Sequence, residues 1–323
     1  MGINMVTISV CMIVKNEEDK LRRCLDSLKD IADEIVIVDT GSTDNTKKIA
    51  SEYTDKIHDF AWTGSFSDAR NYAFSLAKSD YIYSADADEE LDSENIEKFK
   101  VLKAVLDTNI DIVQMYYCNQ LENNTIYSFD RELRPKLYKR LRTFVWEESI
   151  HEAVRLNPLI FDSDIDIIHN PGPGHAKRDL AAFEKQIESE IGLSDRLAEI
   201  YAKELYIAGD KDNYIKAREF FEDMCEQVEL DKDSFVRALT MAAKCNREAG
   251  NTAGFMKYAL RAAAGEMLGS ELCYELGMYY EELGDKLEAC IWYQNALTET
   301  ECYLDIQCQE RYAKEKLERL TGK

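Results

Sequence analysis

The sequence predicts an α/β domain with a mostly parallel sheet in residues 1–176, followed by an all-α domain of helical repeats in residues 177–323. Two observations support this division. Short β-rich runs alternate with amphipathic helical stretches up to about residue 118, whereas only helical patterns occur from about residue 177. A chain of 323 residues also suits two domains of ordinary size better than one small core.

Five segments of the N-terminal part predict strands: residues 6–14, 34–39, 55–60, 80–85 and 111–118. The first two are almost continuously apolar, which is typical of a sheet covered on both faces. Apolar residues at helical spacing lie between them, as at Leu21, Cys24, Leu25 and Leu28. This alternation predicts βαβ units, whose ligands bind beyond the carboxyl ends of the strands. Residues 120–175 instead predict several short strands and a Pro/Gly loop.

The C-terminal part contains three helical segments that align on a Gly-Asp or Gly-Asn turn, at Gly209, Gly250 and Gly284. The turns are 41 and 34 residues apart. The second offset matches the helix-turn-helix period of tetratricopeptide repeats. We therefore expect a tetratricopeptide-like repeat domain, with most of its aromatic residues packed between repeats.

The charge and the cysteines narrow the classes of function. With 40 Lys and Arg against 62 Asp and Glu, the net charge is −22, which disfavours nucleic acid and anionic membranes as partners. Nine scattered cysteines without a CxxC pair indicate reduced thiols. No apolar run is long enough for a signal or membrane segment, so the sequence predicts a soluble cytoplasmic protein.

The segment YIYSADADEELD, residues 81–92, places five carboxylates directly after a predicted strand. An EF-hand calcium loop would need Gly where Leu91 stands. A cap of the following helix by Asp92 or Ser93, with the helix dipole, would explain Asp92 and Glu90 but not Asp86 and Asp88. In an extended segment Asp86 and Asp88 would point to the same side. We therefore expect a divalent-metal site that holds a nucleotide diphosphate.

Four motifs in matching order, SVCMIVKNEE (9–18), EIVIVDTGSTDNT (34–46), DARNYA (68–73) and ADADEEL (85–91), resemble the family-2 glycosyltransferases. The resemblance covers about residues 6–175 and implies the Rossmann-like GT-A fold. Together with the repeats, it resembles the bacterial subgroup that joins such a catalytic domain to tetratricopeptide repeats. The family implies an inverting transferase that uses a nucleotide-activated sugar, here expected to be a UDP-sugar, with Mn²⁺ or Mg²⁺.

The resemblance also implies roles for individual residues. Asn16 and Glu17 would border the ribose, and Asp39 would contact the base or ribose, although Thr40 stands where the family often has a second acid. Arg70 would lie near the diphosphate, and Asp88, followed by Asp86, would bind the metal. The full set expected at the donor is Val14, Asn16, Glu17, Asp39, Arg70, Asp86, Ala87, Asp88 and Lys177.

A general base is required because inversion needs the acceptor to lose a proton as it attacks. The segment WEESIHEAV (146–154) resembles the His-Glu strand of this subgroup, which makes Glu152 the first candidate and Glu148 the second. In an extended segment His151 would face the other side and contact acceptor or metal. A late histidine, His169 or His175, would add a metal ligand, as the family often has one.

The expected function is transfer of a sugar, guessed as GlcNAc or glucose, to Ser, Thr or Cys of a protein or peptide held by the repeats. Flagellin-like and bacteriocin-like acceptors follow by analogy with the subgroup, and the repeats could also form a homodimer. The alternatives are transfer to a lipopolysaccharide core or capsule sugar, and a repeat adaptor that binds nucleotide-sugar without turnover. A dehydrogenase is disfavoured because no GxGxxG follows the first strand.

Overall fold

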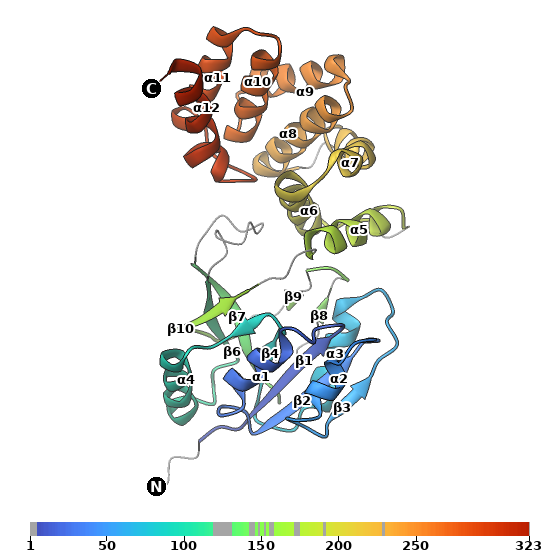
Figure 1. The fold of residues 1–323 in the computed structure, drawn as a ribbon, viewed down its shortest axis with the longest axis vertical. Helices are drawn as coiled ribbons and strands as arrows, with labels where there is room; N and C mark the ends of the chain where they lie inside the picture. The colour runs from blue at the N-terminus through green and yellow to red at the C-terminus, as the bar shows by residue number, and fades with distance from the viewer. Residues whose placement is uncertain are drawn as a thin grey trace. The chain divides into compact units, whose positions relative to one another are not determined.

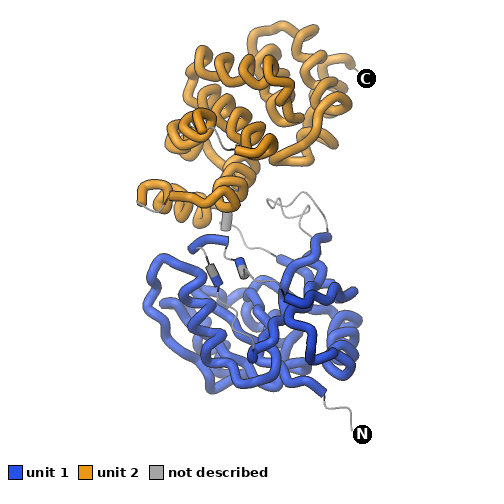
Figure 2. Tube along the Cα trace, turned by 180° about the vertical axis from the view of Figure 1, so that it is seen from behind, with its two compact units in different colours: residues 1–123, 129–173 blue, residues 124–128, 174–323 orange. Residues whose placement is uncertain are grey.

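A computed structural model describes residues 5–118, 131–141, 146–147, 149–151, 153–154, 158–170, 175–189, 192–227 and 230–322. These residues divide into two compact units (Figures 1 and 2). The first contains the described residues up to 170, and the second those from 175 onward.

The first unit is built on a mixed sheet with the strand order β3-β2-β1-β4-β7-β6-β10-β5. Strands β3, β2, β1 and β4 are parallel, as are β6 and β10, while β7 is antiparallel to both of its neighbours. The expected mostly parallel sheet is therefore confirmed. Its strands are β1 (Ile8–Val14), β2 (Glu34–Asp39), β3 (Ile57–Asp59), β4 (Tyr81–Ala85), β5 (Glu89–Glu90), β6 (Ile112–Cys118), β7 (Arg131–Lys139) and β10 (Ile160–His169).

All five predicted strands are present, but the region after β6 differs from the expectation of short strands. Strands β7 and β10 are nine and ten residues long and join the main sheet. Only β8 (Trp146–Glu147) and β9 (Ala153–Val154) are short, and they pair with each other. The long strands were not expected because charged residues interrupt their apolar patterns.

Helices cover both faces of the sheet, which explains the continuous apolar character of β1 (Figure 1). On one face Ile8, Val10 and Met12 belong to a buried cluster with residues of α1 (Leu21–Leu28) and α4 (Ser93–Val105). On the other, Cys11 packs with residues of α3 (Phe66–Leu76). The short helix α2 (Thr46–Ala50) follows β2. Both sets of alternating side chains are thus removed from water.

The second unit is helical, as expected for a repeat domain. Helices α8 and α10 pack against α9 and α11, respectively, and Gly250 and Gly284 supply left-handed turns with φ of 75° and 82°. The helices are α5 (His175–Ile187), α6 (Asp195–Ala208), α7 (Lys211–Met224), α8 (Lys232–Glu248), α9 (Thr252–Ala264), α10 (Ser270–Glu282), α11 (Lys286–Thr298) and α12 (Ala313–Thr321), with a π-helical turn, Cys308–Tyr312, before α12.

Gly277 lets α10 and α11 approach closely. A Cβ atom at this position would lie 2.5 Å from the ring of Tyr293, which is fully buried. Helix-turn-helix pairs are what the repeat period predicted. All nine cysteines are free in the structure. Within the described part of the chain, every helix is too short or too polar to cross a bilayer.

Candidate active site

The acidic segment after β4 forms a turn, not the extended strand expected from the sequence. The backbone N–H of Glu89 donates to the carbonyl of Asp86 at 3.1 Å, and β5 then pairs with β10. Period-two alternation does not apply within a turn. The expectation that Asp86 and Asp88 point to the same side because the segment is extended is therefore wrong. Ala87, expected at the donor, is a buried residue of this turn.

Asp88 and His169 are brought together at the end of β10. His169 Nε2 lies 3.5 Å from Asp88 Oδ2, and both side chains are mostly buried. The imidazole ring lies against Tyr117, with ring centroids 4.7 Å apart. The backbone N–H of Asn170 donates to the Asp88 carbonyl at 2.9 Å, which ties the turn to β10. Two side chains expected as metal ligands thus lie side by side.

Asp86 is engaged by cations instead. Arg70, on α3, donates through Nη2 to Asp86 Oδ1 at 3.2 Å and through Nη1 to Ser84 Oγ at 2.7 Å. Lys136 Nζ lies 3.8 Å from Asp86 Oδ2. Burial acts to raise the pKa of Asp86, but these two cations hold it well below its ordinary value. Asp86 is consequently an ionised group fixed in place by its partners.

Lys136, on β7, has no assigned role in the sequence-based expectations. Its ammonium donates to Glu89 Oε1 at 2.5 Å and to the Ser84 carbonyl at 3.2 Å, and both charged side chains are buried. Burial and the adjacent aspartates raise the pKa of Glu89 despite this contact. The sequence contains the basic segment RPKLYKR (134–140). Its local pattern does not show which of the basic side chains faces the interior.

The carboxyl ends of β1 and β2 form the second part of the site, where Val14 is the register partner of Asp39. Asp39 is fully buried, and its Oδ1 accepts from the backbone N–H groups of Gly41 and Ser42 at 2.9 and 2.8 Å. Its Oδ2 is also buried and has no hydrogen-bond partner among the described residues. This oxygen is available to a donor group of a ligand.

Asn16 and Glu17 connect the end of β1 to the loop after β2. Asn16 has φ of 54°, and its Oδ1 accepts from the backbone N–H of Thr43 at 2.8 Å. The backbone N–H of Glu17 donates to Thr46 Oγ1 at 2.7 Å. Both residues therefore border the same edge of the sheet as Asp39.

The segment that was expected to face the acceptor, residues 146–154, contains two short paired strands and not the single extended strand expected. Strands β8 and β9 pair with each other, and His151 between them has φ of 47°. Asn71 of α3 braces β8 by accepting from the Trp146 N–H at 2.8 Å and donating to its carbonyl at 3.1 Å. We expected His151 to face the side opposite to its neighbours because side chains alternate along an extended segment. This expectation is wrong, because a residue with positive φ interrupts that alternation.

Several expected site residues receive no test from this geometry. Glu148 and Glu152 lie outside the described residues. Lys177 is exposed on α5 in the second unit, and α5 begins at His175, whose side chain is not described. Their roles stay predictions.

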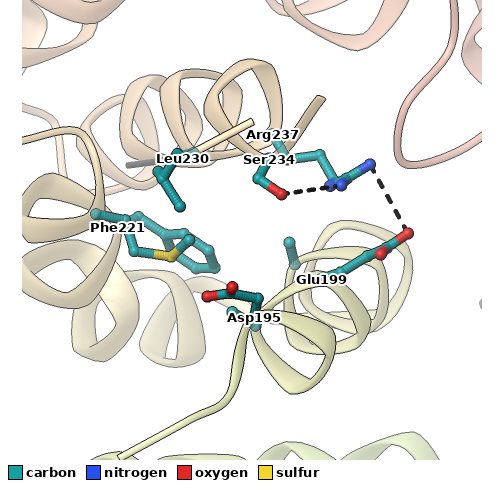
Figure 3. Close-up of a pocket in the computed structure, with 10 residues that line it drawn as sticks. Asp195, Glu199, Phe221, Leu230, Ser234 and Arg237 are labelled. Atoms are coloured by element: carbon teal, nitrogen blue, oxygen red, sulfur yellow. Dashed lines mark hydrogen bonds and ion pairs between the residues drawn. The ribbon is translucent and has the colours of Figure 1, made fainter. Parts of the chain in front are cut away.

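A small pocket lies within the second unit, between α6, α7 and α8 (Figure 3). Apolar side chains, including Phe221 and Leu230, line it, and Asp195 stands at its edge. Arg237 Nη1 lies 3.7 Å from Glu199 Oε1, and its Nη2 donates to Ser234 Oγ at 3.3 Å. The pocket therefore combines an apolar wall with three charged side chains, of which Arg237 and Glu199 form an ion pair.

The fold and the polar strand ends of the first unit define a domain of the GT-A class, with acidic groups and a histidine gathered beyond the sheet. Residues 9–166 match the family model described as "Glycosyl transferase family 2". The N-terminal domain belongs to this family, and the chain joins it to tetratricopeptide-like repeats.

Several curated proteins are similar to parts of the chain. "TPR repeat-containing protein Synpcc7942_0270" of Synechococcus elongatus is 47% identical over 91 residues, 28% of this chain and 23% of that protein. "Uncharacterized glycosyltransferase RT0209" of Rickettsia typhi is 30% identical over 175 residues, 51% of this chain and 56% of that protein. "SPbeta prophage-derived glycosyltransferase SunS" of Bacillus subtilis is 32% identical over 167 residues, which are 51% of this chain and 39% of that protein. The chain thus matches at most 56% of the length of these relatives.

Solved structures show a more distant similarity. Glucosyl-3-phosphoglycerate synthase from Mycobacterium tuberculosis, in complex with Mn²⁺ and UDP-glucose, has a TM-score of 0.40 at 14% identity, covering 56% of this chain and 76% of that one. TarS from S. aureus has a TM-score of 0.39 at 13% identity, covering 90% and 55%.

Proposed function

We propose that the chain is an inverting, metal-dependent glycosyltransferase that transfers a sugar from a UDP-sugar to a protein or peptide. The observation that carries the proposal is the Asp88–His169 pair beyond the sheet of a family-2 domain, flanked by the Arg70–Asp86 pair. Carboxylate, imidazole and guanidinium groups together suit a metal-bound diphosphate.

The donor nucleoside is proposed to bind at the ends of β1 and β2. The buried, unpaired Oδ2 of Asp39 would accept a hydrogen bond from the base or ribose, and Asn16 and Glu17 would border it. A buried acceptor without a partner costs free energy until a ligand donor satisfies it. This cost favours a ligand that presents N–H or O–H at that point.

The metal is proposed to be held by Asp88 and His169, with Asp86 adjacent. A carboxylate oxygen and an imidazole nitrogen suit Mn²⁺ better than Mg²⁺, because Mg²⁺ takes oxygen ligands almost throughout. When bound, the ion would neutralise charge on the departing diphosphate. Arg70 would add a fixed positive charge, and Glu152, or else Glu148, would take the proton from the acceptor.

The acceptor is proposed to be an extended polypeptide that the repeat unit recognises, with Ser, Thr or Cys as nucleophile. Stacked helix pairs present continuous surfaces that suit such segments.

The test is release of nucleotide diphosphate from a panel of UDP-sugars, measured with Mn²⁺ and with EDTA. We expect metal-dependent release that increases when a peptide acceptor is added. A nucleotide-sugar adaptor would bind a donor in a thermal-shift assay, where saturating ligand at 100 times its dissociation constant adds about 2.7 kcal/mol, but would release no diphosphate. Binding without release under all conditions would overturn the enzyme proposal in favour of the adaptor.

A further inference from the structure

We propose that Lys136 is a positioning residue for the metal-binding turn. By pairing with Glu89 it holds the Asp86–Glu89 turn in the shape that presents Asp88 to His169. This inference rests on the metal site proposed above. It assigns to a cation on β7 a role in metal affinity, although that cation is not itself a candidate ligand.

The Lys136 ammonium is fully engaged inside the protein. It donates to Glu89 Oε1 at 2.5 Å and to the Ser84 carbonyl at 3.2 Å. The exposed fractions of the Lys136 and Glu89 side chains are only 6% and 2%. Charged side chains this deeply buried are held in one geometry, because each would be costly to leave without its partner.

Glu89 transmits this anchor to the turn through both its backbone and its carboxylate. The Glu89 N–H donates to the Asp86 carbonyl at 3.1 Å, and the Asp86 N–H donates to Glu89 Oε2 at 3.3 Å. One oxygen of Glu89 therefore contacts Lys136 while the other closes the turn. Removal of Lys136 would release the carboxylate that braces the backbone of Asp86.

The far side of the turn is already tied to the strand that carries His169. Glu89 is the register partner of His169, and the Asn170 N–H donates to the Asp88 carbonyl. The turn that contains Asp88 is therefore held at two points. The Asn170 N–H binds the Asp88 carbonyl from β10, and the Glu89 carboxylate, paired with Lys136, binds the Asp86 N–H. Outer contacts of this kind orient metal ligands, and their loss typically lowers metal affinity by about 10- to 100-fold.

The alternative is that the pair only stabilises the fold, and a second lysine–carboxylate pair in the same unit, in which the lysine is mostly buried, serves as a control for this. Lys103 Nζ lies 2.5 Å from Asp33 Oδ2 and donates to the Ile31 carbonyl at 3.1 Å; the Lys103 side chain is 10% exposed and that of Asp33 is 38% exposed. Asp33 also accepts from the N–H of Ile8, at the amino end of β1. This pair has the same chemistry at the opposite end of a strand from the site.

The experiment compares two double variants of the full chain, each of which leaves the net charge unchanged. They are Lys136→Met with Glu89→Gln, and Lys103→Met with Asp33→Asn. Mn²⁺ affinity is measured by electron paramagnetic resonance titration in the presence of UDP, and folding by circular dichroism. We expect Mn²⁺ binding about 10-fold weaker in the first variant and within about 2-fold of wild type in the control.

Glu89→Asp is a second variant that keeps the charge and shortens the arm that reaches the Asp86 N–H. It separates position from charge even if the double variant does not fold. We expect it to weaken Mn²⁺ binding by about 10-fold as well, whereas Lys136→Arg, which keeps a donor for Glu89, should preserve most of the affinity.

Three outcomes would overturn parts of this reasoning. Wild-type affinity in Glu89→Asp, or in the folded Lys136 double variant, would show that Lys136 does not position the turn. An equal loss in the Lys103 control would assign the effect to stability alone. Absence of Mn²⁺ binding by the wild-type chain would instead refute the metal site of the proposed function, and this inference with it.

Discussion

His169 Nε2 lies 3.5 Å from Asp88 Oδ2, although the two residues are far apart in the sequence. Asp88 precedes β5, His169 ends β10, and the antiparallel pairing of these strands places Glu89 opposite His169. The metal site proposed for this domain is thus assembled by strand pairing at the edge of the sheet. Its geometry depends on backbone hydrogen bonds between β5 and β10 together with the side-chain contact that closes the turn, from the Asp86 N–H to Glu89 Oε2.

Asp88→Asn should reduce metal-dependent UDP release by at least about 100-fold, because even loss of an outer-shell contact costs about 10- to 100-fold in metal affinity or activity. Circular dichroism should show an unchanged fold. Asp92→Asn is the control: Asp92 caps α4 by accepting from the Asn95 N–H, and Asn caps about as well. Activity of Asp88→Asn within a few-fold of wild type would refute Asp88 as a ligand.

His169→Asn should weaken Mn²⁺ binding by about 10-fold or more, as expected when a group at a metal centre is lost. The measurement is a Mn²⁺ titration with UDP present. His58→Asn, on β3, removes a half-buried histidine of the same unit that packs edge-on to Tyr72, and should bind Mn²⁺ as the wild type does. Equal affinities for all three proteins would exclude His169 from the site.

Arg70→Lys should lower the turnover rate by about 10-fold or more while keeping the positive charge. Arg70 uses two separate nitrogens for Ser84 Oγ and Asp86 Oδ1, whereas a lysine has only one, and a hydrogen bond to a charged group contributes about 1.5–3 kcal/mol. Arg22→Lys is the control, since Arg22 forms an exposed pair with Glu52. The turnover rate is measured by steady-state kinetics with a saturating donor. An unchanged rate in Arg70→Lys would contradict a role for the two guanidinium nitrogens of Arg70.

Glu152→Gln should bind donor normally and turn over about 10²-fold more slowly, the range usual for loss of a general base. The hairpin around His151 removes the alternation argument for the facing of these residues, so Glu148→Gln must be measured in parallel. A cysteine acceptor would reduce the effect, because a thiol with a pKa near ~8.5 is partly ionised at neutral pH. Slow turnover in Glu148→Gln alone would move the base to Glu148.

Glu275→Gln should destabilise the repeat unit by about 3–5 kcal/mol at neutral pH, since it breaks a buried ion pair. Glu275 is 1% exposed and accepts from Lys244 Nζ at 2.6 Å and Arg247 Nε at 2.8 Å. Hydrogen exchange of peptides from α8 and α10 measures the change in the full chain. Glu282→Gln removes an exposed partner of the same Arg247 and should cost less than about 1 kcal/mol.

The same carboxylate predicts a pH dependence. Burial acts to raise the pKa of Glu275, but Lys244 and Arg247 lower it below its ordinary value of 4.5. A lowered pKa in the folded state stabilises the fold above 4.5, and this stabilisation is lost as pH falls through the folded value. Protection of α8 and α10 should therefore decline below about pH 4.5 in the wild type and less steeply in Glu275→Gln. Equal acid sensitivity would contradict this assignment.

Local sequence pattern was sufficient for much of the fold. Strands β1 and β2 were recognisable because both of their faces are buried, so nearly every residue is apolar. The turns at Gly250 and Gly284 were recognisable because a left-handed φ favours glycine. Asp88 and His169 were expected at the site because the sequence resembles family-2 glycosyltransferases, in which Asp88 matches the metal motif and a late histidine, His169 or His175, often adds a ligand. These features depend on neighbours in the chain, which sequence patterns record.

The shape of the site depended on contacts between distant segments. Strand β7 inserts antiparallel between β4 and β6, and this brings Lys136 beside Glu89 and Asp86. The turn after β4 and the positive φ of His151 likewise arise where short strands pair with remote partners. The alternation of apolar and polar side chains along one strand does not predict which strand will pair with it. Strand pairing depends on the free energy of the whole sheet. The types of residue expected at the site could therefore be predicted from the sequence, whereas the orientation of their side chains depended on the order in which the strands pair.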